Sequence, residues 1–176
     1  MKETSKDSIV DLILKKPDEF EKHKTKNMDL TEVDFSNLTL ENVNFHQCDL
    51  TGSSFGEAHL TEINFSDSDL TCASFVRSNI VECDFSNSNL NGCDFSSSSV
   101  EYCNFQDAQM SGCTMFDADF SNCDLSGALN LEEAKFDEST IWPDSDRLPS
   151  EFEGRSNADL SSLQDDDEMQ DSIEDY

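Results

Sequence analysis

Residues 61–95 divide into seven units of five, TEINF SDSDL TCASF VRSNI VECDF SNSNL NGCDF, and every unit ends in an apolar residue. The pattern extends in both directions, so that every fifth residue from Leu30 to Leu125 is apolar over twenty consecutive units. Nine of these twenty positions hold Phe and seven hold Leu. Neither the helix period of 3.6 residues nor the strand period of two produces this spacing. The sequence therefore predicts a protein built from five-residue repeats.

We call the position of the large apolar residue the centre of the unit. Most units also have a smaller apolar residue two positions before the centre. Six of the seven cysteines occupy this smaller position: Cys48, Cys83, Cys93, Cys103, Cys113 and Cys123. The residue directly before the centre is Asp, Asn, Ser or Thr in most units, and these residues favour turns. Each unit therefore sends two side chains inward and three outward. One unit cannot bury its own apolar residues, so coils must stack to do so.

Units such as ENVNF, TEINF, TCASF and FDADF resemble the pentapeptide-repeat family, whose consensus is roughly A-[DN]-[LF]-x-x. The resemblance covers about residues 28–128. It implies an all-β solenoid, a right-handed quadrilateral β-helix with four units in each coil and hence about five coils here. Residues twenty apart then stack, and the stacks are nearly uniform in type: Phe35, Phe55, Phe75, Phe95 and Met115 form one of them. This uniformity supports the four-unit coil independently of the five-residue count.

The two ends of a stacked helix need covering. We expect residues 1–26 to form an N-terminal helical cap, because Ile9, Leu12 and Ile13 have helical spacing and Phe20 could lie over the first coil. We expect residues 27–142 to form the β-helix with an irregular closing segment. The residues expected to cover its last coil are Leu131, Phe136, Ile141 and Trp142. Residues 143–176 are rich in Asp, Ser and Glu, and we expect a solvated, disordered tail.

The charge of the chain limits the kinds of partner that it can bind. The formal net charge is −28, and residues 27–128 hold seventeen acids but only one base, Arg77. Nucleic acid and anionic membrane would be repelled, so we expect direct binding to neither. The chain has no apolar run long enough to span a bilayer and no segment typical of a secretory signal at its start. We therefore expect it in the cytoplasm.

Residues that could carry chemistry are few. His23, His46 and His59 have no Ser or Cys partner in a recognisable nucleophile motif. The inward cysteines could form a metal or redox ladder, but they lack the spacing of zinc ligands, and thiols also serve as small core residues. Glycine is too scarce for a phosphate-binding loop. We expect no catalytic activity, no cofactor and no metal.

Two functions fit this description. The first is a non-enzymatic protein–protein interaction module or scaffold. The second is a DNA mimic that acts on a DNA-binding enzyme such as DNA gyrase, as some members of the resembling family do. Five coils would be about 24 Å long and carry about one net charge per 1.5 Å, against one per roughly 1.7 Å in duplex DNA. One observation counts against mimicry. Eight of the seventeen acids directly precede a centre, where their carboxylates could stabilise the local turn instead of binding a partner.

The candidate residues for binding a protein partner are four glutamates on one side of the predicted coil: Glu41, Glu62, Glu82 and Glu101. None of them occupies the turn position before a centre, so their carboxylates are expected to be free for a partner. Some members of the family that this sequence resembles form dimers through their C-terminal ends. The apolar region around Trp142 permits such a homodimer here.

Overall fold

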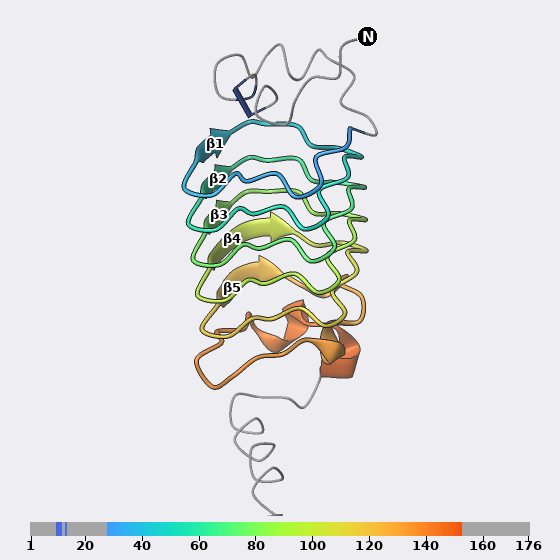
Figure 1. Ribbon diagram of the computed structural model, residues 1–176. Helices are drawn as coiled ribbons and strands as arrows, with labels where there is room; N and C mark the ends of the chain where they lie inside the picture. Colours follow the sequence, from blue (N-terminus) through green and yellow to red (C-terminus); the bar gives the residue numbers. More distant parts are fainter. Residues whose placement is uncertain (1–9, 12, 14–27, 153–176) are drawn as a thin grey trace, which may run out of the picture.

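The computed structural model describes residues 10, 11, 13 and 28–152, and the repeats form a β-solenoid (Figure 1). One side carries a sheet of five parallel strands in the order β1-β2-β3-β4-β5. Their bounds are Thr39–Glu41 (β1), His59–Thr61 (β2), Asn79–Val81 (β3), Ser99–Asn104 (β4) and Asp119–Asp124 (β5). Leu40 pairs with Leu60, and Leu60 pairs with Ile80. The twenty-residue coil predicted from the sequence is therefore confirmed, and four complete coils separate β1 from β5.

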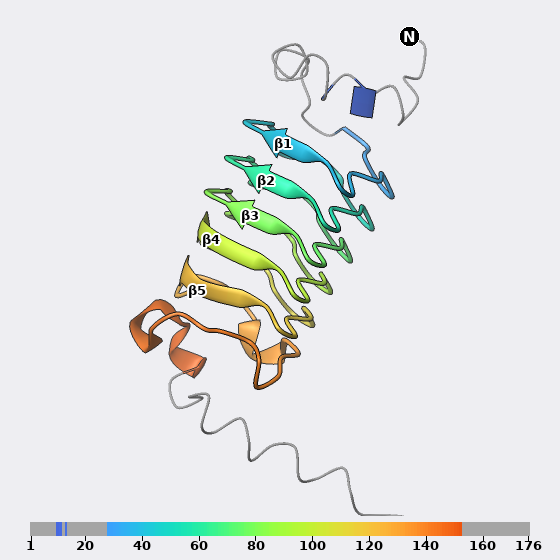
Figure 2. The same cartoon turned by 90° about the vertical axis from the view of Figure 1, so that its left-hand side faces the viewer.

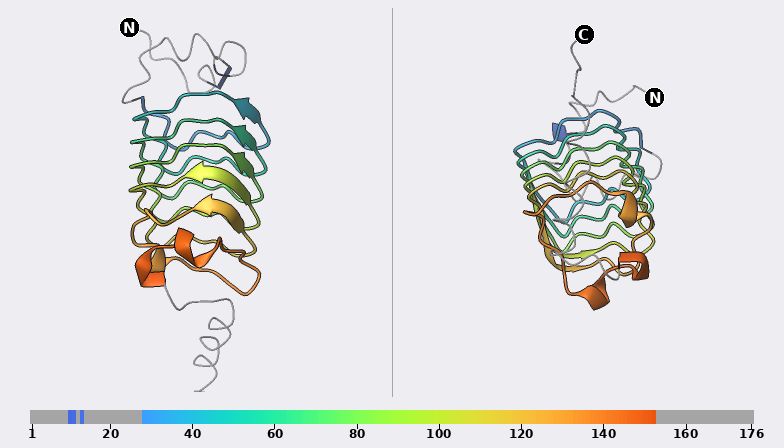
Figure 3. Two further views of the ribbon diagram at one scale, coloured as in Figure 1. Left: turned by 180° about the vertical axis from the view of Figure 1, so that it is seen from behind. Right: turned by 90° about the horizontal axis from the view of Figure 1, so that it is seen from below.

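The other three sides are joined mainly by single parallel bridges, of which Asp29 to Asp49 and Asp34 to Ser54 are examples. Most of these bridges also link residues twenty apart, so the coils lie over one another along the stack (Figure 3). The sides stay short because the chain turns in every unit. Within the described residues, no helix has the length and hydrophobicity that a membrane span would require.

On the three sides without the strands, a tight turn follows the centre of each unit. In one of them the amide of Ala73 donates to the carbonyl of Leu70 at 2.8 Å. Cys72 lies between them with a φ of 58°, and a positive φ at the third residue is typical of a type II turn. Sixteen described residues other than glycine take a positive φ, nearly all of them two residues after a centre. This repeated left-handed residue redirects the chain at most corners.

Where the residue before a centre is Asp, its side chain stabilises the chain segment that follows the centre. The carboxylate of Asp69 accepts a hydrogen bond from the amide of Thr71 at 3.0 Å. All eight aspartates at this position form this Asx-type bond with the residue two further on. Hydrogen bonds from the side chain and the backbone of Ser36 lower the pKa of Asp34. The predicted role of these acids as turn residues is confirmed.

The core consists of two stacks of phenylalanine rings that meet edge to face. In the first stack, Phe55 and Phe75 lie with their ring centroids 5.1 Å apart. In the second, the centroids of Phe65 and Phe85 are 4.9 Å apart. The rings of Phe65 and Phe75 are nearly perpendicular, at 85°. Because equal side chains repeat every twenty residues, inner rings such as Phe75 have a ring of the same shape above and below them.

The N-terminal cap can be followed only in part. Val10, Asp11 and Ile13 are helical, and Ile13 is buried against the core of the solenoid. Ile9, Leu12 and Phe20, on which the prediction also relied, lie outside the described residues. The helical cap over residues 1–26 therefore stays a prediction.

The closing segment departs from the strict period. Thr114 pairs with Lys135 and Asp119 pairs with Ile141, so the spacing grows to 21 and then to 22 residues. Leu131 is fully buried, and Phe136 and Trp142 pack against the core, as predicted. The prediction for Ile141 was wrong, because this residue is 48% exposed. Its bridge to Asp119 places it before a centre, where side chains point outward.

The packed region also extends further than expected. Three short 3₁₀ helices lie at this end: η1 (Leu131–Glu133), η2 (Ser145–Arg147) and η3 (Ser150–Phe152). Phe152 is buried and lies 5.5 Å from the ring of Trp142. Residues 143–152 thus belong to the closing segment rather than to the tail. The rest of the predicted tail, residues 153–176, lies outside the described residues.

Candidate binding face

The four predicted glutamates lie on the same side of the solenoid as the five strands, which we call the sheet face (Figure 2). Glu41 ends β1 and Glu101 lies in β4. They occupy one ladder of paired residues, with Thr61 and Val81 between them. Glu62 and Glu82 follow directly after β2 and β3, one coil apart. The structure therefore brings together the residues that sequence spacing predicted to share a side.

Most of these carboxylates are available to a partner. Glu41, Glu62 and Glu82 are exposed, and none of their carboxylates forms a hydrogen bond or ion pair with the described residues. Glu101 is half-buried and accepts a hydrogen bond from the hydroxyl of Ser99 at 3.5 Å. Coils in a sheet lie about 4.8 Å apart, so the carboxylates of Glu62 and Glu82 are near neighbours.

On the other sides of the repeats, acids have internal roles. Most are the aspartates that hold turns, and the others mainly bind a neighbouring coil. The carboxylate of Glu57 lies 3.8 Å from the guanidinium of Arg77, and Asp117 accepts a hydrogen bond from Ser97 at 3.1 Å. Among the repeat acids, only Glu32 and Asp107 are comparably uncommitted away from the sheet face. The sheet face is therefore where free carboxylates gather.

No described cation balances this face. The only lysine or arginine residues in the described part of the chain are Arg77, Lys135 and Arg147. The guanidinium of Arg77 forms an ion pair with Glu57 at a corner. Lys135 forms a parallel backbone bridge with Thr114, and the carbonyl of Arg147 accepts a hydrogen bond from the amide of Leu125. None of the three lies in a strand of the sheet face, although Arg77 stands at the corner two residues before β3. The field over the sheet face is thus negative, which favours a basic partner.

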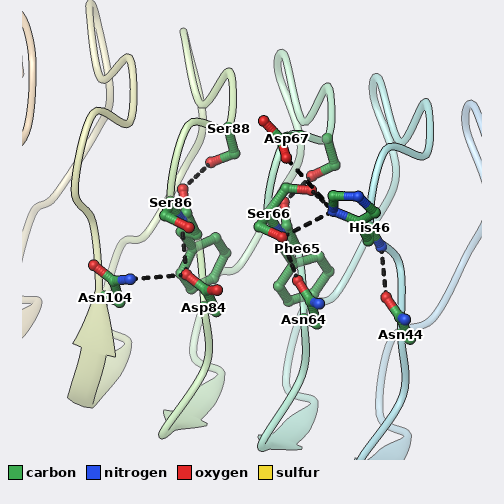
Figure 4. Close-up of polar contacts among 12 residues, drawn as sticks. Asn44, His46, Asn64, Phe65, Ser66, Asp67, Asp84, Ser86, Ser88 and Asn104 are labelled. Atoms are coloured by element: carbon green, nitrogen blue, oxygen red, sulfur yellow. Dashed lines mark hydrogen bonds and ion pairs between the residues drawn. The ribbon is translucent and has the colours of Figure 1, made fainter.

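His46 lies beside a serine and an aspartate on the adjacent side (Figure 4), a combination that could suggest a nucleophile and its base. Its Nδ1 is 3.0 Å from Ser66 Oγ, 3.1 Å from the Ser66 carbonyl and 3.6 Å from Asp67 Oδ2. Because a carbonyl can only accept, the bond to it requires the proton on Nδ1. The Ser66 hydroxyl meanwhile donates to Asn64 at 2.6 Å. Neither the proton on His46 Nδ1 nor the hydroxyl proton of Ser66 is placed for nucleophilic attack by Ser66. The cluster instead links two neighbouring coils by hydrogen bonds.

The cysteines behave as core side chains. The six at the small inward position are buried and Cys72 is exposed, as their spacing predicted. Burial raises the pKa of Cys48 to about 11 and that of Cys113 to about 12. Burial also raises the pKa of Cys93 well above its ordinary value. Within the described residues, no three Cys, His, Asp or Glu side chains are grouped so that they could hold a metal ion.

Two family models match the repeats. The model described as "pentapeptide repeat region" matches residues 38–115, and the one described as "pentapeptide repeats (8 copies)" matches residues 103–142. The chain belongs to the pentapeptide repeat family. Together the matches cover most of the solenoid described above, including all five strands. No curated protein is significantly similar to the whole sequence.

Solved pentapeptide repeat proteins share the fold. One from the thylakoid lumen of Arabidopsis thaliana is 28% identical, with a TM-score of 0.53 over 55% of this chain and 68% of that one. Rfr23 from the cyanobacterium Cyanothece 51142 is 21% identical, with a TM-score of 0.57 over 73% of this chain and 99% of that one. QnrB1, a plasmid-mediated fluoroquinolone resistance protein, is 16% identical over 67% of this chain and 72% of that one. Its TM-score of 0.26 is too low to carry over any of its properties.

Sequence reasoning missed one feature of the sheet face in this pentapeptide repeat protein. Tyr102 directly follows Glu101 in β4, and its side chain is 63% exposed. The signal was present in the sequence, because Tyr102 is the only aromatic residue that stands two positions after a centre in the repeats. Trp142, which we expected near a homodimer contact, is half-buried against Phe136 and Phe152 of its own chain. The homodimer stays a prediction.

Proposed function

We propose that this protein is a non-enzymatic interaction module whose sheet face binds a basic surface of a protein partner. The observation that carries the proposal is the group of uncommitted glutamates on that face, with no described cation beside them. A solenoid has a rigid, flat side on which charges repeat at a fixed interval, and such a side suits recognition of another protein. The negative field supplies steering and selectivity toward a basic partner.

Charge reversal on the sheet face tests the proposal. Glu62→Lys with Glu82→Lys is compared with Glu32→Lys and Asp107→Lys, which lie on two other sides. All four residues are exposed and have a positive φ, and each double variant changes the net charge equally. The immobilised proteins are exposed to lysate of the source organism, and the affinity of each retained protein is measured as salt is raised.

We expect the sheet-face variant to bind its partner at least tenfold more weakly, about 1.4 kcal/mol, and the control variant to bind nearly as the wild type does. Wild-type affinity should fall steeply with salt. Equal losses in the two variants would mean that binding follows the overall charge and that the sheet face has no special role. Retention of no protein by the wild type would count against an interaction module altogether.

The second candidate is a DNA mimic, which the charge along the solenoid favours. The repeats carry a net charge of −16 over about 24 Å, close to the linear charge density of duplex DNA. Eight of the repeat acids hold turns, however, and they lie on all four sides. The direct assay is inhibition of gyrase supercoiling by the purified protein at moderate salt. Absence of inhibition at micromolar protein, with no DNA-binding protein captured from lysate, would remove this candidate.

A further inference from the structure

Tyr102 stands where folding gives no reason for an aromatic ring. Its φ of 56° is in the left-handed region, which bulky side chains rarely adopt. The other described residues with positive φ are Asn, Asp, Glu, Gln, Ser, Cys, Arg and Gly. With 63% of its surface exposed, the ring recovers little of this cost by burial. A side chain that strains its backbone without packing points to a role outside the fold.

The surroundings of Tyr102 are acidic and locally irregular. Glu101 precedes it in the chain, and Glu82 occupies the equivalent corner one coil earlier, where its amide donates to the carbonyl of Glu101 at 2.9 Å. One coil later Asn122 pairs with Glu101 rather than with Tyr102, and it has no positive φ. The register between β4 and β5 shifts on both sides of Glu101, whereas the pairings among β1, β2 and β3 are regular. Tyr102 thus follows one glutamate in the chain and lies one coil after another glutamate, at the point where the sheet departs from its period.

We propose that Tyr102, Glu82 and Glu101 receive an arginine side chain of the protein partner, an inference that rests on the proposed function of the sheet face. A guanidinium is planar, so it can stack on an aromatic ring while its edge donates to a carboxylate. Arginine and tyrosine are also the residues that most often anchor protein interfaces. The net charge on the face excludes an anionic occupant and selects a cationic one. The partner segment therefore presents arginine, and lysine is a poorer substitute.

The test uses the full chain and two labelled peptides, one alternating Arg with Gly and the other alternating Lys with Gly. Their affinities are measured by fluorescence anisotropy for the wild type, Tyr102→Asn and Tyr102→Phe. Asparagine suits a positive φ, so Tyr102→Asn should melt at the same temperature as the wild type or higher. Phe116→Ser is the matched control, because Phe116 is exposed but lies outside the five strands, directly after Met115.

We expect the wild type to prefer the Arg peptide by about fivefold, and Tyr102→Asn to abolish this preference while keeping the binding that charge alone provides. Tyr102→Phe should retain the preference because it keeps the ring, and Phe116→Ser should not affect it. A preference that survives in Tyr102→Asn, or one that the wild type lacks, overturns the inference. A lower melting temperature of Tyr102→Asn with unchanged preference would show a structural role instead.

The same variant separates this inference from the function on which it rests. Suppose that the double variant Glu62→Lys with Glu82→Lys no longer binds the lysate partner, while Tyr102→Asn binds it normally. The sheet face then binds its partner without an arginine stacked on Tyr102, and only this inference fails. If neither variant changes the binding of any captured protein, both proposals fail. Loss of the partner in both variants supports both.

Discussion

The rings of Phe75 and Phe95 lie face to face, with their centroids 4.9 Å apart and an interplanar angle of 5°. Phe75 stacks in the same way on Phe55 and meets Phe65 and Phe85 edge to face. Four aromatic neighbours enclose it, so its removal leaves a cavity that adjacent rings cannot fill. We expect Phe75→Ala to lower the free energy of unfolding by about 3–5 kcal/mol, measured by urea denaturation.

The control for this change is Ser86→Ala. Ser86 bonds the carboxylate of Asp84 through its backbone amide, which alanine retains. We expect an effect within about 0.5 kcal/mol. Similar losses in Ser86→Ala and Phe75→Ala would contradict the assignment of inward and outward positions.

The turn aspartates should make stability depend on acid. The pKa of Asp34 is lowered in the fold, so its carboxylate stabilises the protein above its ordinary pKa of about 3.8, and this contribution is lost as the pH falls through the lowered value. Asn44 and Asn64 accept the same turn bond, so Asp34→Asn should keep the turn without the acid dependence. We expect the wild type to lose stability relative to Asp34→Asn below about pH 4, measured by denaturation across pH.

Asp34→Ala provides the comparison, because it removes the hydrogen-bond acceptor altogether. We expect it to cost about 1 kcal/mol at neutral pH. If the alanine and asparagine variants were equally stable, the carboxylate of Asp34 would have no part in holding its turn.

The thiols should divide sharply by reactivity. Cys72 is exposed, whereas the other six are buried, and burial raises the pKa of Cys48, Cys93 and Cys113. Because the thiolate is the reactive form, we expect one thiol per native chain to react rapidly with a disulfide reagent and six more after denaturation. In Cys72→Ser the rapid phase should vanish. Rapid reaction of a second thiol, or a native disulfide in the non-reduced protein, would refute this division.

The end of the packed chain should lie at Phe152. We expect deletion of residues 153–176 to leave the melting temperature nearly unchanged, because that stretch has few apolar residues. Deletion from Pro149 onward also removes Phe152, which packs on Trp142 and Phe136, and should lower the melting temperature by on the order of 10 °C. Phe152→Ala in the full chain should reproduce most of that loss. A large loss from the shorter deletion would show that residues 153–176 also support the fold.

The solenoid could be predicted from the sequence because its rules are local and repeat. Each coil contacts mainly the coils before and after it, so the positions of Phe75 and Leu70 follow from counting in fives and in twenties. The same counting placed the four glutamates on one side. It also placed Asp34 and Asp124 in their turns, where hydrogen bonds now account for their lowered pKa values.

Prediction failed where the period ends. Once Asp119 pairs with Ile141 at a spacing of 22 residues, position in the sequence no longer tells which way a side chain points. Ile141 was therefore expected inside but lies outside, and the burial of Phe152 went unrecognised. Tyr102 was missed for another reason. Its exposure is an ordinary consequence of its position, and the φ of 56° shows that a ring there is costly.

The pairing of Leu60 with Ile80 limits how a solenoid of this kind could change length during evolution. Tandem duplication of residues 60–79 would insert one whole coil and place a second copy of Glu62 on the same side. Insertion of a single five-residue unit would rotate all later sides by a quarter turn, and Glu82 would no longer lie beside Glu62. Within the regular repeats, the chain can therefore gain or lose residues only in steps of twenty if its sides are to stay in register. Each duplication of residues 60–79 would therefore add one glutamate to the sheet face.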